Sequence, residues 1–175
     1  MIPAVSQTLA RILVCQTSLG TVQQVSFDRP RLYQSQPVGV NLYVYDVRQS
    51  ASKPAEAELL GEAATNSAPP ASPDPLSWVE ISFLVVARDW TRLGEQQLLA
   101  EAIAYFAEHS EIPEERLVPA LQGQGGVAIE IIQPRDVTGL WRALAVPLQP
   151  ALYLKVTVPL MGGVPLSQSA TCLQT

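Results

Sequence analysis

Histidine and cysteine are scarce in this chain of 175 residues, which has one histidine, His109, and two cysteines, Cys15 and Cys172. The cysteines have no CxxC partner and no metal-ligand spacing, so the pattern points away from a zinc site. Cys15 falls in an expected helix and is predicted to be a small buried side chain. A disulfide between Cys15 and Cys172 is disfavoured in a reducing compartment. His109 ends another expected helix, where an imidazole suits the negative end of the dipole, and without a nucleophile beside it the residue is a weak catalytic candidate.

Charge is also sparse. Asp, Glu, Lys and Arg make up 15% of the residues, against about a quarter in ordinary domains. The formal net charge is −5, and the eleven Lys and Arg are scattered along the chain. Nucleic-acid binders and proteins that bind anionic membranes normally carry a basic footprint, so neither partner is expected. A chain with so little surface charge often buries part of its surface against other chains.

The sequence has no apolar run as long as a membrane span. Its first residues, MIPAVSQTLARILVCQ, lack the basic and unbroken apolar regions of a secretory signal. We therefore expect synthesis in the cytoplasm and no direct membrane insertion.

The usual catalytic motifs are absent as well: there is no GxSxG elbow, P-loop or GxGxxG fingerprint. The nearest glycine-rich stretch, GQGG at 123–126, is expected to be a turn with positive φ. Glu111, Glu114 and Glu115 lack the alternating ligand spacing of a metal loop and are interpreted as a solvated loop. The sequence therefore predicts no catalytic residue, no metal site and no cofactor; an unrecognised metal-assisted enzyme around these glutamates stays open as an alternative.

What the chain does have is apolar periodicity, with hydrophobic residues at 47%. Strand-like alternation is clearest at 38–46, where Val38, Val40, Leu42 and Val44 share one face. In 77–89 one face carries Val79, Ile81, Phe83, Val85 and Ala87, and in 151–160 one face carries Leu152, Leu154, Val156, Val158 and Leu160. Further strands are expected at 21–27 and 126–132.

Helical spacing predicts a helix over 3–17, with Pro3 in its first turn and Gly20 stopping it. A second helix is expected over 92–109, capped by Thr91, and a short one around Trp141. The predicted buried stripe of the second helix is Leu99, Ala102, Ile103 and Phe106. These elements predict an α+β fold, a mostly antiparallel sheet with helices packed on one face.

A long proline-rich insert is expected at 48–76, because five of the fifteen prolines lie there and APPASPDP does not fit inside a sheet. No linker splits the remainder, so we expect one domain over 1–161 and a flexible tail over 162–175 that begins with Gly162 and Gly163.

The stretch ARDWTRLGE at 87–95 permits two interpretations. Arg88, Trp90 and Arg92 are residue types common at binding hot spots, which indicates a contact patch. Alternatively, the stretch is a strand-to-helix corner whose tryptophan closes the edge of the core, and the residues alone favour this second interpretation.

The ordered segments MIPAVSQTLARIL, VSFDRP, VGVNLYVYDVRQS, PLSWVEISFLVVARDW and EQQLLAEAIAYF, followed by LWRAL and PALYLKVTVPL, together resemble one bacterial family. The chain is similar to the N-terminal domain of the tail-terminator, or cap, proteins of extracellular contractile injection systems, which are relatives of phage tails. The match spans nearly the whole chain. It departs from the family pattern at VRQSASKP, which follows the Tyr-Asp pair, and in the insert.

The resemblance implies a structural role without catalysis or cofactor. Such proteins form a sixfold ring that caps the inner tube and the contractile sheath and fixes particle length. The expected partners are copies of the chain itself, the sheath protein and the tube protein, in a particle assembled in the bacterial cytoplasm and then released or membrane-attached. An adaptor role at the baseplate or a membrane anchor is the alternative. The residues expected at protein contacts are Arg48, Lys53, Pro54, Glu58, Pro69, Pro70, Arg88, Trp90, Arg92, Gly162 and Gly163.

Overall fold

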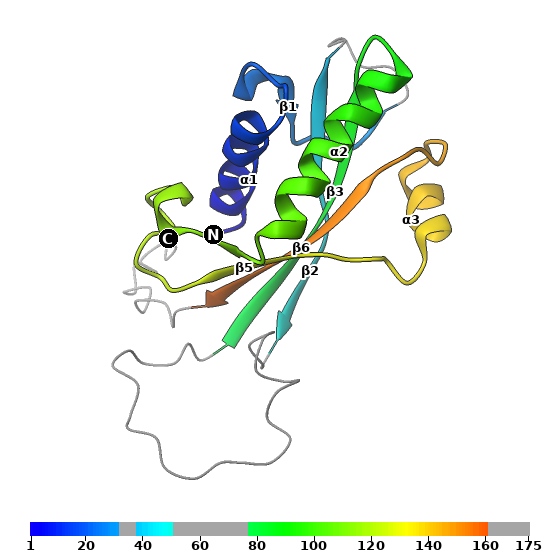
Figure 1. The fold of residues 1–175 in the computed structure, drawn as a ribbon. Helices are drawn as coiled ribbons and strands as arrows, with labels where there is room; N and C mark the ends of the chain where they lie inside the picture. Colours follow the sequence, from blue (N-terminus) through cyan, green and yellow to red (C-terminus); the bar gives the residue numbers. More distant parts are fainter. Residues whose placement is uncertain (32–37, 51–76, 161–175) are drawn as a thin grey trace, which may run out of the picture.

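The computed structural model describes residues 1–31, 38–50 and 77–160, and Figure 1 shows how their helices and strands are arranged. The helices are α1 (Ile2–Gln16), α2 (Arg92–Glu108) and α3 (Val137–Leu144), with short 3₁₀ turns at Val22–Gln24 and Glu114–Arg116. The strands are β1 (Val25–Ser26), β2 (Gly39–Ser50), β3 (Ser77–Arg88), β4 (Glu111–Ile112), β5 (Val127–Ile131) and β6 (Leu152–Leu160).

The six strands form one sheet in the order β1-β2-β3-β6-β5-β4. Only β1 and β2 pair in parallel within the described residues, and the other four neighbouring pairs are antiparallel. The long central strands β2 and β3 stay paired from Gly39 with Arg88 at one end to Ser50 with Trp78 at the other. The predicted α+β class with a mostly antiparallel sheet is therefore confirmed.

The main core lies between one face of this sheet and the pair α1 and α2, which run side by side across it in Figure 1. The predicted alternation of the central strands is confirmed: Val40 and Leu42 of β2, Phe83 of β3 and Val156 of β6 all belong to this core. Successive side chains of a strand point to opposite faces, so a period of two in the sequence was sufficient to find these residues.

A second, smaller core covers part of the opposite face, where α3 packs. Leu84 and Val86 of β3 meet Trp141 and Leu144 of α3, and the indole Nε1 of Trp141 donates a hydrogen bond to the Tyr153 hydroxyl at 2.8 Å. Figure 1 shows α3 well apart from α1 and α2. The expectation that all helices pack on one face is therefore wrong, because Leu84 and Val86 make part of the second face of β3 apolar and that part also needs cover.

Two details of α1 differ from the expectation. The helix ends at Gln16, before Gly20, because the hydroxyl and the N–H of Thr17 both donate to the carbonyl of Leu13 and Thr17 itself is extended. Cys15 is exposed, so its predicted burial is wrong: it lies outside the stripe that Leu9 and Leu13 direct into the core. Cys172 lies outside the described residues.

Helix α2 buries a slightly different stripe from the predicted one. Leu99, Ala102 and Phe106 are buried as expected, but Ile103 is 44% exposed. Leu98 and Tyr105 are buried in its place. The apolar face of α2 is wide, and its position is set by where the sheet lies, so the sequence pattern located the face only to within one residue.

Three loop predictions can also be compared with the structure. The expected strand at 21–27 shortens to the two residues of β1 after a 3₁₀ turn. Gly123 and Gly125 have φ of 74° and 108°, which confirms the positive-φ turn. The insert does not start at Arg48, because β2 continues through Ser50. The rest of the predicted insert and the predicted tail lie outside the described residues, so the domain boundaries stay predictions.

Candidate functional site

The turn between β3 and α2 holds three of the predicted contact residues, Arg88, Trp90 and Arg92. The Asp89 carboxylate accepts hydrogen bonds from the N–H of Thr91 at 2.9 Å and from its hydroxyl at 3.2 Å. The Thr91 hydroxyl in turn accepts from the N–H of Gly94 at 2.9 Å and caps α2, as predicted. Any side chain at Gly94 would collide with the Asp89 carboxylate. The turn is therefore fixed by its own hydrogen bonds and presents its side chains in one arrangement.

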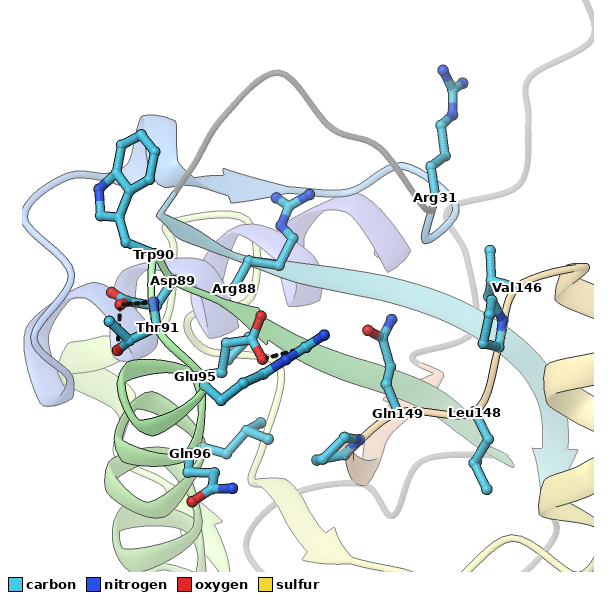
Figure 2. Close-up of a pocket in the computed structure, with 15 residues that line it drawn as sticks. Arg31, Arg88, Asp89, Trp90, Thr91, Glu95, Gln96, Val146, Leu148 and Gln149 are labelled. Atoms are coloured by element: carbon cyan, nitrogen blue, oxygen red, sulfur yellow. Dashed lines mark hydrogen bonds and ion pairs between the residues drawn. The ribbon is translucent and has the colours of Figure 1, made fainter.

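Trp90 is 78% exposed and Leu93, one turn away on α2, is 77% exposed. The interpretation that Trp90 closes the edge of the core is therefore wrong, although the sequence favoured it. In Figure 2 the indole of Trp90 points away from the other labelled side chains. Exposed large apolar side chains that lie together on a rigid turn are typical of a protein contact surface.

Beside this turn lies a cavity of about 650 Å³, which we call the corner pocket. Figure 2 shows Arg88 and Glu95 on the side formed by β3 and α2, and Val146, Leu148 and Gln149 on the opposite side. The whole lining consists of Arg31, residues 87–92, Glu95, Gln96, Leu99 and residues 146–150. Leu148 is 66% exposed, so the rim carries apolar surface on both sides.

Arg88 is the unusual group in the corner pocket. All its guanidinium nitrogens are shielded from solvent, and none makes a hydrogen bond to the described part of the chain. Burial lowers the pKa of Arg88 below its ordinary value. The carboxylate of Glu95 opposes this shift, because a nearby negative charge favours the protonated form. An arginine stays protonated in a protein, so this site holds a positive charge that the Glu95 carboxylate favours at a distance but that no group in the described residues meets in a hydrogen bond or ion pair. A buried charge of this kind costs free energy until an acceptor meets it.

The other charges around the corner pocket are in different positions. Arg92 is exposed and pairs with Glu95 across 2.8 Å, a surface ion pair that contributes little stability. Arg31 is exposed at the rim, on the loop that follows β1. Sequence reasoning missed Arg31, Leu148 and Gln149, because they come from loops far apart in the chain and carry no motif.

Arg48, another predicted contact residue, does not line the corner pocket. It lies on β2 opposite Glu80 of β3, toward the other end of this strand pair from Arg88, and forms an ion pair with Asp46 at 2.6 Å. The other predicted contact residues lie outside the described residues: Lys53, Pro54, Glu58, Pro69, Pro70, Gly162 and Gly163.

The acidic stretch around Glu111 was the one metal candidate. Among the residues that the structure describes, no three His, Cys, Asp or Glu side chains come together as a group able to hold a metal ion. Glu114 instead accepts a hydrogen bond from the N–H of Gly123 at 2.8 Å.

None of the helices in the described ranges is long and apolar enough to cross a bilayer.

Comparison with known proteins places the chain in a family context. The model of the Pvc16 N-terminal domain family matches residues 4–171. The sheath/tube terminator of PVC, an extracellular contractile injection system, solved in the extended state, aligns over 100% of this chain with a TM-score of 0.60 and 15% identity. The tube-terminating cap of the anti-feeding prophage aligns over 98% with a TM-score of 0.48 and 15% identity. The first of these likenesses shows a shared terminator-like fold.

This chain spans 62% and 59% of the lengths of those two proteins. No curated protein matches it.

Proposed function

Because this chain belongs to the Pvc16 N-terminal domain family, we propose that it is the terminator of a contractile injection particle. In this role it closes the inner tube and the sheath at the end distal to the baseplate, and so fixes the length of the particle. The observation that carries the proposal is the family match over residues 4–171, on a fold shared with a protein that itself terminates a sheath and tube.

The proposed partners follow from this role. The chain forms a hexameric ring of identical copies, and the ring contacts the sheath protein on one side and the tube protein on the other. Its sparse charge and the exposed apolar side chains Trp90, Leu93 and Leu148 support a surface made for protein contacts. The role needs no substrate and no cofactor, and it places the chain in an assembled particle rather than free in the cell.

Two predicted segments are proposed as contact arms: the insert between β2 and β3, and the tail over 162–175. A proline-rich segment such as 52–72 starts with restricted conformations, so it loses less entropy when it docks on a neighbour. A chain that lacks 52–72 is expected to fold and to lose ring formation or capping. If that deletion assembles with unchanged affinity, the segment is not an arm.

Particle length tests the function itself. Particles from cells that lack the chain are expected to have overlong or ragged sheaths in negative-stain images, because nothing stops sheath growth. Supplying the intact chain is expected to restore a narrow length distribution. Normal lengths with lost attachment to the baseplate or to a membrane anchor would identify an adaptor instead and overturn the proposal.

A further inference from the structure

The corner pocket holds a positive charge that lacks a hydrogen-bond acceptor in the part of the chain that the structure describes. The Arg88 guanidinium is shielded from solvent and makes no hydrogen bond within the described residues, while its neighbour Arg92 is already paired with Glu95. Arginine forms its best contacts with a carboxylate, which takes two parallel hydrogen bonds from the planar guanidinium. The chemistry of the corner pocket therefore suits a carboxylate side chain from outside.

The opposite end of α2 carries the complementary charge. Glu108, Glu111 and Glu115 are exposed there, and no ion pair within the described residues involves any of them. We call these residues the acidic end. Helix α2 has 17 residues, so about 25 Å separates the acidic end from the corner pocket. Figure 1 shows α2 running between these two ends of the molecule.

The acidic end is not explained by the stability of the helix. The last turn of α2 contains Glu108 and no basic residue. A negative charge at a helix C-terminus faces the negative end of the dipole and is mildly unfavourable. The nearby Arg116 lies over the Tyr105 ring, 5.4 Å from its centroid, and forms no ion pair with these glutamates. His109 is hydrogen-bonded to the Tyr105 carbonyl at 2.8 Å. The glutamates thus remain available to an external partner.

We infer that the corner pocket of one copy receives a glutamate from the acidic end of the next copy, with the Arg88 guanidinium as the central donor and the glutamate carboxylate as the acceptor. The inference rests on the proposed function and names the contact that closes the ring. Two different patches at opposite ends of a chain make a heterologous, head-to-tail contact, which generates a closed ring when the rotation between copies allows it. Leu148, 66% exposed at the rim, supplies apolar surface beside the charged pair.

Two complementary variants test the contact on the full chain. The variant Arg88→Met keeps the acidic end and loses the pocket charge. The triple variant Glu108→Lys, Glu111→Lys, Glu115→Lys keeps the pocket and reverses the acidic end. Sedimentation velocity is expected to show self-association of the unmodified chain that each variant weakens by about 30-fold or more, since each removes one side of a desolvated charge pair.

Mixing the two variants gives the sharpest result. One intact pocket and one intact acidic end remain in the mixture, so a 1:1 dimer is expected although each variant alone is monomeric.

Arg11→Met is the matched control, because Arg11 is an exposed arginine on α1 that belongs to neither end. This control is expected to associate like the unmodified chain. Circular dichroism of each variant checks that it is folded; the triple variant changes only exposed side chains, so it tests the contact even if Arg88→Met unfolds.

The inference is overturned if the unmodified chain stays monomeric at every concentration, if the triple variant associates normally, or if the mixture remains monomeric. Sheath length separates this outcome from failure of the proposed function. If particles without the chain are overlong while the triple variant still restores normal length and self-associates, the terminator role stands and the contact is wrong. If particles without the chain have normal length, the terminator role itself fails.

Discussion

At the scale of single residues, most polar groups are satisfied, but buried side-chain atoms of Asn41, Arg88 and Tyr105 lack a hydrogen-bond partner in the described residues, and Arg88 is the charged one. The side-chain Nδ2 of buried Asn41 donates to the carbonyl of Asp28 at 2.7 Å, although its Oδ1 accepts no hydrogen bond in the described residues, and buried Thr8 accepts from the N–H of Val118 at 3.2 Å. Arg88 has no such partner in the described residues. An unpaired charge lowers the stability of the isolated chain. We expect it to contribute to binding in the assembly, where a partner supplies the missing hydrogen-bond acceptor.

Replacing Arg88 tests this balance between the isolated and the assembled chain. Arg88→Met removes an unpaired shielded charge and keeps most of the packing, so the isolated chain is expected to gain about 1 kcal/mol in free energy of unfolding. Urea denaturation at low protein concentration measures the difference. Arg11→Met, at an exposed site, is expected to change stability by no more than about 0.5 kcal/mol. If Arg88→Met instead lowers the free energy of unfolding by more than about 0.5 kcal/mol, the guanidinium stabilises the monomer.

At the scale of elements, each helix has its own attachment to the sheet or to its neighbour. Helix α3 is short, with 8 residues, and is held by Trp141, which is 2% exposed and bonded to Tyr153 of β6. The residues that follow α1 are linked to the middle of α2, because Glu101 accepts hydrogen bonds from the N–H and the hydroxyl of Ser18 at 2.7 and 2.9 Å. These contacts are local, so each can be tested alone.

The attachment of α3 depends on the Tyr153 hydroxyl. Tyr153→Phe leaves the buried indole N–H of Trp141 without its acceptor and is expected to lower the free energy of unfolding by about 1–3 kcal/mol. Chemical denaturation followed by tryptophan fluorescence measures this loss. Tyr43→Phe is the matched control on the same face, because the Tyr43 side chain packs against this core but makes no hydrogen bond within the described residues. Equal effects of the two substitutions would contradict the role given to the Trp141 bond.

The link between α1 and α2 is expected to depend on pH. A hydrogen bond from Gln97, aided by those from Ser18, lowers the pKa of Glu101 below its ordinary value despite some desolvation. A carboxyl whose pKa is lowered in the folded state adds stability above its unfolded pKa of about 4.3, and this stability is lost as the pH falls through the folded value.

Glu101→Gln is therefore expected to cost about 0.5 kcal/mol at pH 7, a small value because the site is partly exposed. This difference from the unmodified chain is expected to shrink as the pH falls below about 4.3. Thermal unfolding across the acid range measures it. A difference that stays constant with pH would show that the Glu101 charge is not involved.

At the scale of the whole molecule, the other elements pack around the antiparallel pair β2 and β3, each strand of which has 12 residues. One face carries α1 and α2, the other carries α3, and the corner pocket lies where the β3 end meets α2. The acidic end lies at the far end of α2, so the two charged regions are held about 25 Å apart by a rigid helix. This spacing gives each copy two distinct ends, which head-to-tail assembly requires.

Much of this architecture could be predicted from the sequence, because it depends on local periodicity. The inward faces of β2, β3 and β6 follow from a period of two, and Thr91 was recognisable as a helix cap. The site was harder to predict. Nothing local shows that Trp90 points to solvent, that α3 covers the second face, or that Arg31 and Leu148 line the same pocket as Arg88. These features depend on how distant segments meet in three dimensions.

The position of the chain on the particle tests the central claim most directly. A compact label fused to the chain, imaged by electron microscopy on intact particles, is expected to mark one end only, the end opposite the baseplate, where tube and sheath stop. Label at the baseplate, along the sheath, or absent from the particle would contradict the account.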